Sequence, residues 1–414
     1  MVFLLHIWGP AFGLPSLDAH CLAAVAYLKQ CLRHDEWALV PSDPNQNPLG
    51  ELPALKDGEI WIGGFHNIVA YLRDRSAGQY DRDKDLSQTQ LADRTAYTSF
   101  IDSRGQSLLD LSLYVSTENY TKCTRPALGD LLSWPDSWFV PHKLRDGAKK
   151  RSEHLGLSGL DVDTAQDERE EDSMTAQIPK SLRKPRLTVS SMLGRDMKRN
   201  KFRLDAVTAD FFEPLEDMLG GKKWLIGDSM TSADCLALAY LALMRGPKGI
   251  AHSWLKDAMR SKYSDLNGWF EEKREVCFGL PVAHRFNLED EKRNLPWTTS
   301  AQPTWQQIVN AAMLNVAEAT PWLGAALDKQ LLPADTSPRT PVRSKPVTRY
   351  ASKQKAMSEI QGHRLLYSHL FGSSICVAIT TGLLFWNGLL VLPSWPRGPK
   401  ARSFGAAGAM LGLG

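Results

Sequence analysis

Ser16 stands at a point of the chain where a serine could do chemistry. It follows the loop GPAFGLP and precedes an apolar stripe of helical spacing that runs from Leu17 to Leu32. Serine is among the best residues for the N-cap of a helix. The start of a helix also carries partial positive charge, which together with nearby backbone amides would stabilise a thiolate there. Both roles are open at this stage, and the ordinary preferences of serine favour the N-cap.

The cysteines do not form a metal-binding or redox pattern. No two of them have the C-x-x-C spacing or any other metal-ligand spacing. Scattered thiols of this kind are typical of a protein in a reducing compartment. The six cysteines are Cys21, Cys31, Cys123, Cys235, Cys277 and Cys376. We therefore nominate no metal ligand and no cofactor-binding residue from the sequence.

Length and charge limit the classes of function that fit the chain. Its 414 residues have room for two domains and tails, and 43% apolar residues are ordinary for a protein with a sizeable core. A net charge of +3 is too small to predict a nucleic-acid partner. The apolar run Phe3 to Trp8 has no basic residue before it, and the first is Lys29. We therefore expect a buried first strand there and no signal peptide.

The elements that must position Ser16 alternate between strand and helix. A second strand is predicted at Glu36–Val40, after the helix that begins near Ser16. The stretch GELPALKDGEIWIGGFHNIVAYL, residues 50–72, then reads as a hairpin followed by a helix. Its first strand is entered through Pro53, and Asp57-Gly58 has the composition of a two-residue type I′ turn. The order is strand, helix, strand, hairpin and helix.

This order resembles the thioredoxin-like domain of glutathione transferases. In that family the proline at the position of Pro53 is cis and shapes the ligand-binding edge. A Glu or Gln followed by Ser then grips the γ-glutamyl end of glutathione, but this chain has Gly63-Gly64 at those positions. Several transferase classes also place an activating Ser or Cys at the start of the first helix. Here that leaves Ser16 or, one turn further in, Cys21, so we expect the fold without the ligand grip.

From Leu86 onward the pattern is helical. The segment 144–187, with the run QDEREED, has little apolar surface, so we expect a disordered or frayed insertion there. Thr231 and Asp234 have the Thr-x-x-Asp spacing of a capping box before a long apolar run, which gives both residues a structural role. In transferase-like proteins this box begins the core helix of the helical domain. A further amphipathic helix is predicted at about 304–332.

The end of the chain predicts a linker and a membrane anchor. Residues 333–361 contain four prolines and an excess of basic residues. Leu370 to Leu392 then runs without a charge, with Leu383 near its middle, and is long enough to span a bilayer. Basic and aromatic residues flank this segment. Because the bulk of the chain precedes it, we expect a tail anchor with the folded part in the cytosol.

The predicted fold class is therefore α/β plus all-α, transferase-like, with a C-terminal transmembrane helix. Its parts are a thioredoxin-like domain, a helical domain with the charged insertion, a linker, an anchor and a short tail. The thioredoxin-like domain is predicted at 1–80 and the helical domain at 86–332, with the charged insertion at 144–187. The linker follows at 333–361, the anchor at 370–392 and the short tail at 393–414.

Three stretches together resemble the metaxin family. They are GLPSLDAHCLAAVAYL, the hairpin with Gly63-Gly64, and the segment around ENYTKCTRP. The charged insertion, the basic linker and the late hydrophobic segment look like the fungal member of that family in the mitochondrial sorting and assembly machinery. The resemblance implies a non-enzymatic protein of the mitochondrial outer membrane facing the cytosol, with no catalytic residue and no cofactor.

The same resemblance implies the partners. Metaxin-family proteins work with a β-barrel core subunit and a second metaxin-like subunit, and they help insert and release newly made β-barrel precursors. The alternative function is a membrane-tethered, divergent glutathione transferase, similar to the ganglioside-induced differentiation-associated proteins. What separates the two is whether a thiol-activating side chain faces the groove beside Pro53, and Ser16 is the first candidate.

Overall fold

The structure is a computed structural model. It describes residues 2–44, 47–134, 136–155, 189–246, 250–279 and 294–298, with 189–201 as helical backbone alone. The chain divides into two units, Met1–Arg364 and Leu365–Gly414, and all described residues belong to the first. The predicted helix 304–332, the linker 333–361, the anchor 370–392 and the tail 393–414 lie outside the described residues.

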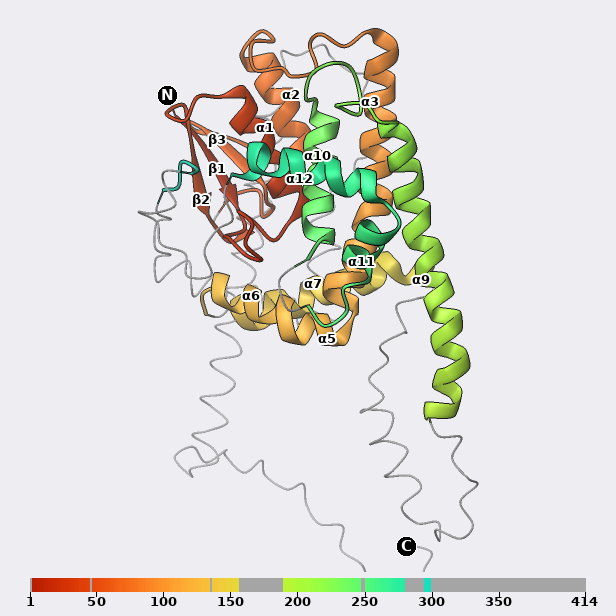
Figure 1. The fold of residues 1–414 in the computed structure, drawn as a ribbon. Helices are drawn as coiled ribbons and strands as arrows, with labels where there is room; N and C mark the ends of the chain where they lie inside the picture. Colours follow the sequence, from red (N-terminus) through yellow and green to blue (C-terminus); the bar gives the residue numbers. More distant parts are fainter. Residues whose placement is uncertain are drawn as a thin grey trace, which may run out of the picture. The chain divides into compact units, whose positions relative to one another are not determined.

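A four-stranded sheet forms the first part of the fold, drawn in red in Figure 1. The order is β2-β1-β3-β4, and β1 is parallel to β2 but antiparallel to β3, which is in turn antiparallel to β4. Helix α1, Ala19–Cys31, connects the two parallel strands, and α2, Phe65–Arg75, follows the hairpin. The strands are β1 Phe3–Ile7, β2 Trp37–Pro41, β3 Ala54–Asp57 and β4 Ile60–Gly63.

The hairpin turn is shifted by one residue from its predicted position. Asp57 still pairs with Ile60 across β3 and β4, so the two turn residues are Gly58 and Glu59. Only Gly58 of the two has a positive φ, of 60°. A positive φ at the first turn residue alone is the pattern of a type II′ turn, for which glycine is the preferred residue. The predicted type I′ turn at Asp57-Gly58 is therefore wrong.

Helices make up the rest of the described chain (Figure 1). Residues 88–115 form one helical run with π-helical segments, which places Asp102 and Asp110 at its widened turns. The run consists of α3 Gln88–Phe100, η2 Ile101–Gly105, α4 Gln106–Leu109 and η3 Asp110–Val115. The later elements are α5 Thr117–Asn119, η4 Tyr120–Thr124, α6 Arg125–Leu131, α7 Asp136–Ser152, η5 Glu153–Leu155, α9 Val189–Leu219, α10 Ser232–Met244, α11 Trp254–Ser261 and α12 Ser264–Phe278.

Helix α10 is the centre of the core. Every one of its residues is buried, because it packs against α1 on one side and against α3 and α12 on others. A helix that is apolar all round is typical of such an interior position. One continuous cluster of buried side chains joins it to the sheet and to α2. The sheet half and the helical half of this unit therefore share a single core.

Two segments differ from the sequence-based expectation. Helix α7 continues to Ser152, so the first residues assigned to the charged insertion at 144–187 are helical, and Ala148 and Ser152 are buried. The segment 294–298, for which the sequence predicts no strand, pairs beside β2: Leu39 N donates to the Pro296 carbonyl at 2.8 Å. Trp297 is buried there. This contact covers the outer edge of the sheet, which would otherwise expose unpaired backbone groups.

Within the described ranges, no helix is both long and apolar enough to cross a bilayer. The predicted anchor positions Leu370, Leu383 and Leu392 lie outside those ranges.

Candidate functional site

Ser16 does not cap helix α1. The N-cap is Asp18, whose carboxylate Oδ2 accepts a hydrogen bond from Cys21 N at 2.9 Å. Ser16 is fully buried, and its Oγ accepts a long hydrogen bond of 3.4 Å from Asp18 N. Aspartate caps as well as serine and adds a negative charge at the positive end of the helix. The predicted N-cap at Ser16 is therefore wrong, and its hydroxyl faces no open groove.

Cys21, the second candidate for thiol chemistry, is also unsuited to it. The side chain is fully buried. Burial, together with the charge of Asp18, raises the pKa of the thiol well above its ordinary value. Only the thiolate is a nucleophile, so a buried and protonated thiol is inert.

The residues after the hairpin, where transferases grip glutathione, offer no side chain for this purpose. The Leu52–Pro53 peptide bond is cis. Gly64 is the N-cap of α2, without a side-chain cap, and its φ of 80° favours glycine. A small cavity of about 80 Å³ lies near the start of α1, lined in part by Trp8, Leu17 and Asp18. Ligand pockets are usually several times larger, at about 300 Å³ or more.

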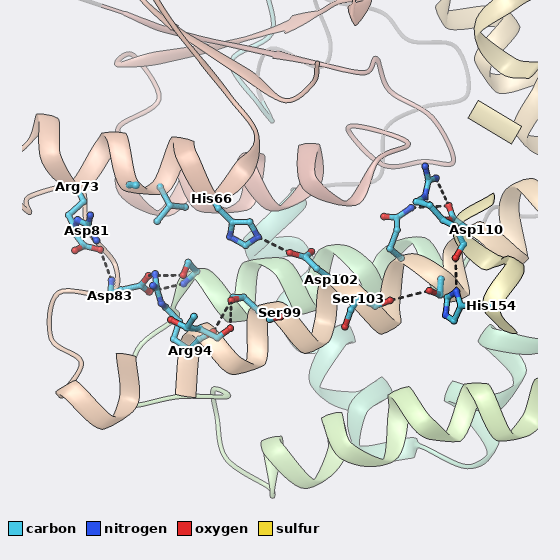
Figure 2. Close-up of a pocket in the computed structure, with 18 residues that line it drawn as sticks. His66, Arg73, Asp81, Asp83, Arg94, Ser99, Asp102, Ser103, Asp110 and His154 are labelled. Atoms are coloured by element: carbon cyan, nitrogen blue, oxygen red, sulfur yellow. Dashed lines mark hydrogen bonds and ion pairs between the residues drawn. The ribbon is translucent and has the colours of Figure 1, made fainter. Parts of the chain in front are cut away.

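A larger groove lies on another side of α2, between this helix and the run 88–115 (Figure 2). Its volume is about 830 Å³, which is within the range of ligand and partner sites. Polar and charged side chains dominate its lining. Those labelled in Figure 2 are His66, Arg73, Asp81, Asp83, Arg94, Ser99, Asp102, Ser103, Asp110 and His154.

Three side chains meet at the edge of this groove. His66, the second residue of α2, lies with Nε2 2.7 Å from Asp102 Oδ2. His20, the second residue of α1, lies with Nε2 3.2 Å from Asp102 Oδ1. Asp102 belongs to η2, so the cluster joins the thioredoxin-like half to the helical half. Two imidazoles and one carboxylate are also a set that can hold a metal ion, and their ligand atoms lie within 4.8 Å of one another.

The surroundings favour the charged forms of His20 and Asp102. Burial would lower the pKa of His20, but the hydrogen bond to Asp102 and the charges of Asp18 and Asp102 outweigh it and raise that pKa. Burial would likewise raise the pKa of Asp102, but its hydrogen bonds to the two histidines hold it well below its ordinary value. Asp102 is therefore a carboxylate throughout the neutral range.

Two further carboxylate groups line the groove, one on each side of His66 and Asp102 (Figure 2). Asp83 Oδ1 accepts from Ser232 N at 2.9 Å, and its Oδ2 accepts from the Ser232 hydroxyl at 2.6 Å and from Arg94 Nη1 at 2.9 Å. Asp110, which is fully buried, accepts two hydrogen bonds from the Arg151 guanidinium, at 2.8 and 2.9 Å. Buried carboxylates with complete partners of this kind usually hold elements together.

Thr231 and Asp234, to which the sequence assigns a structural role, are not among the residues that line the groove. At the start of α10, Thr231 N and the Thr231 hydroxyl both donate to Asp234 Oδ2, at 2.9 and 2.6 Å. Asp234 also accepts from Leu225 N at 2.8 Å through Oδ1. With its lone pairs used in this way and the residue fully buried, Asp234 has no access to a substrate.

The histidine–aspartate cluster is what reasoning from the sequence missed. His20, His66 and Asp102 are separated by 46 and 36 residues and share no motif. Each sits at an ordinary position near the start of a helix or within a helical run. Only the packing of α1 and α2 against η2 brings them together, and no local pattern signals it.

The fold and the site define a class of protein: a glutathione-transferase-like chain whose thiol-activating position is buried. Comparison with known families agrees. Residues 208–272 match the family described as "Glutathione S-transferase, C-terminal domain", and residues 21–145 match Tom37, described as "Outer mitochondrial membrane transport complex protein". Over the matched residues the chain is similar to the metaxin family.

Individual proteins similar to this chain are metaxins. The chain is 27% identical to Metaxin-1 of Macaca fascicularis over 58% of this chain and 64% of that protein, and 27% identical to human Metaxin-1 over 58% and 44%. It is 26% identical to a Metaxin-2 homolog of Caenorhabditis elegans over 54% and 79%. The match to the two Metaxin-1 proteins thus spans less than two thirds of their length.

Proposed function

We propose that this chain is a non-enzymatic subunit of the mitochondrial outer-membrane sorting and assembly machinery. It assists the insertion and release of β-barrel precursors and protein import. Its partners are a β-barrel core subunit, a second metaxin-like subunit and the precursors themselves. The observation that carries the proposal is the metaxin-family match of a chain whose Ser16 and Cys21 are both buried.

The buried position of these two side chains supports a binding role over a catalytic one. A transferase needs an exposed hydroxyl or thiol at the start of α1 and a polar grip after the hairpin. Here the first is enclosed and the second is Gly63-Gly64. The fold is then a platform for protein contacts, and the predicted anchor at 370–392 would keep it at the outer membrane with its folded part in the cytosol.

The proposal is tested by isolating the full chain with its partners. Mitochondria are solubilised in mild detergent, the chain is captured through a tag, and the β-barrel core subunit and second metaxin-like subunit are quantified. We expect both to co-purify, and depletion of the chain to slow the assembly of a newly imported β-barrel protein. Normal β-barrel assembly in depleted mitochondria would contradict the proposal.

Glutathione separates the binding role from the alternative of a tethered, divergent transferase. We predict no saturable binding of glutathione to the purified full chain at millimolar concentration, because no side chain of the kind that grips the tripeptide occupies the transferase position. Isothermal calorimetry measures this directly, with an active glutathione transferase as the positive control. Saturable binding that is lost in Ser16→Ala would favour the transferase and return Ser16 to a catalytic role.

A further inference from the structure

We propose that His20, His66 and Asp102 form a binding site for a divalent transition-metal ion of the zinc class. The site lies where α1, α2 and η2 meet, at the edge of the groove in Figure 2. It is independent of the proposed role in β-barrel assembly, since it rests on three side chains that the role does not use.

The donor set selects the class of metal. Calcium and magnesium prefer sites made of oxygen atoms alone. Two imidazole nitrogens with one carboxylate suit zinc and its neighbours in the transition series. The cysteines described are not part of the cluster, so the site is one of nitrogen and oxygen only.

The distances between the histidine nitrogens and the Asp102 oxygens are close to those between ligand atoms of a zinc site. In a tetrahedral zinc site with ligands at about 2.1 Å, neighbouring ligand atoms are about 3.4 Å apart. His20 Nε2 and Asp102 Oδ1 are 3.2 Å apart, and His66 Nε2 and Asp102 Oδ2 are 2.7 Å apart. Both histidines therefore already turn Nε2 toward the same carboxylate. All three ligand atoms lie within 4.8 Å of one another, so shifts of the side chains would let an ion take the place of the protons between them.

The surroundings allow an ion to enter and hold its ligand in place. The His66 side chain is 51% exposed and Asp102 is 26% exposed, and both line the groove. Asp102 Oδ1 also accepts a hydrogen bond of 3.2 Å from the buried Tyr240 hydroxyl. Such a second contact orients a carboxylate ligand. With three protein ligands, the fourth position of a tetrahedral ion is left for water or for a partner's side chain on the groove side.

The site would bind the two halves of the fold together. His20 and His66 come from the thioredoxin-like half, and Asp102 comes from the helical half. An ion that binds the folded chain alone shifts the unfolding equilibrium toward the folded state. Zinc is therefore expected to raise the melting temperature of the full chain, and to do so only while all three ligands are present.

Zinc binding by the full chain tests the proposal. The detergent-solubilised chain, purified without a histidine tag, is stripped with a chelator and dialysed against buffered free zinc, and bound metal is measured by mass spectrometry. The variants are His66→Ala, which removes a half-exposed ligand, and Asp102→Asn, which keeps the side chain's shape. His154→Ala is the matched control, because it removes an exposed histidine that lines the same groove outside the cluster.

The expected result is about one zinc ion more per wild-type chain than per His66→Ala or Asp102→Asn chain, with binding at least about tenfold weaker in each variant. The His154→Ala chain binds as wild type does. Cobalt gives a second readout: the visible absorption of four-coordinate cobalt appears with wild type and the control, and is absent from the two ligand variants. Equal zinc binding and equal cobalt spectra in wild type and in both ligand variants would overturn the proposal, as would no zinc binding by wild type at micromolar free metal.

Discussion

At the scale of single residues, His6 is a side chain whose pKa differs strongly between the folded and the unfolded chain. It lies in β1, and its Nδ1 is 2.8 Å from the Ser42 hydroxyl, which itself donates to the Val40 carbonyl at 3.2 Å. When the hydroxyl hydrogen is used on Val40, the imidazole donates through Nδ1. Its Nε2 is then unprotonated, and it is buried with no hydrogen-bond partner among the described residues.

Protonation of His6 would place a charged donor where nothing accepts it. Burial, and then the charge of Lys56, lowers the pKa of His6 to about 4. An unfolded histidine titrates near 6.5, so the unfolded chain binds more protons than the folded chain between about pH 6.5 and 4. The contribution of the neutral imidazole is present above about pH 6.5. It is lost as the pH falls toward 4.

We predict that His6→Leu makes the chain less sensitive to acid. Each pKa unit corresponds to about 1.4 kcal/mol, so about 2 kcal/mol of the loss in free energy of unfolding between pH 6.5 and 4 comes from this residue, after allowance for its partial exposure. Urea unfolding of the full chain in detergent, followed by circular dichroism at both pH values, measures the difference between variant and wild type. Parallel losses in the two proteins would contradict the assignment.

At the scale of elements, two helices begin with the same local device in different surroundings. Helix α3 begins at a capping box of Ser87 and Gln90, and α10 begins at one of Thr231 and Asp234. Ser87 is exposed, so water can replace the hydrogen bonds of its box. Thr231 and Asp234 are fully buried, and three donors depend on the single carboxylate of Asp234.

We predict that Asp234→Ala lowers the free energy of unfolding by about 3 kcal/mol or more, because it leaves three buried donors without an acceptor. The matched change Gln90→Ala removes the side chain at the equivalent position of the exposed box. It should lower the free energy of unfolding by less than about 1 kcal/mol. Thermal and urea unfolding of the two full-chain variants give the comparison. If both variants lost the same small amount, the buried box would not be what fixes the start of α10.

The elements also mark how far the sequence predicts the structure. Apolar spacing predicts the order of strands and helices because it reflects burial, which local sequence records. Local sequence does not decide between two neighbouring residues that could each take the same role. Asp18 caps α1 in place of Ser16, and the hairpin turn uses Gly58-Glu59 in place of Asp57-Gly58. The cluster around Asp102 was beyond reach, since it depends on how separate helices pack and not on any spacing.

At the scale of the whole molecule, the proposed function gives different roles to the folded part, which binds the partners, and to the predicted tail, which holds the chain at the membrane. The predicted linker 333–361 has four prolines, and from this composition we expect a segment that does not hold a domain in one orientation. Contacts made by the folded part must then position it on its partners. An anchor at 370–392 would act mainly by raising the effective concentration of the fold at the membrane.

This division predicts which change harms the complex more. Leu55 is fully buried in β3, in register with Leu5 and Ile62, so Leu55→Asp buries a charge without a partner. Such a change costs several kcal/mol, enough to unfold a marginal domain. Lys56→Asp, at the next position of the same strand and on its other face, is the control that adds the same carboxylate where it is only half-buried.

The measurement is the amount of β-barrel core subunit that co-purifies with each variant, beside the assembly of a new β-barrel substrate. We expect the chain that ends near Pro333 to lose part of its partner, because it keeps the described part of the fold but is less concentrated at the membrane. The Leu55→Asp chain should lose nearly all of it, and the Lys56→Asp chain little. If the tail-less chain lost its partner completely while the Leu55→Asp chain kept it, binding would reside in the tail and the transferase-like fold would not be the binding module.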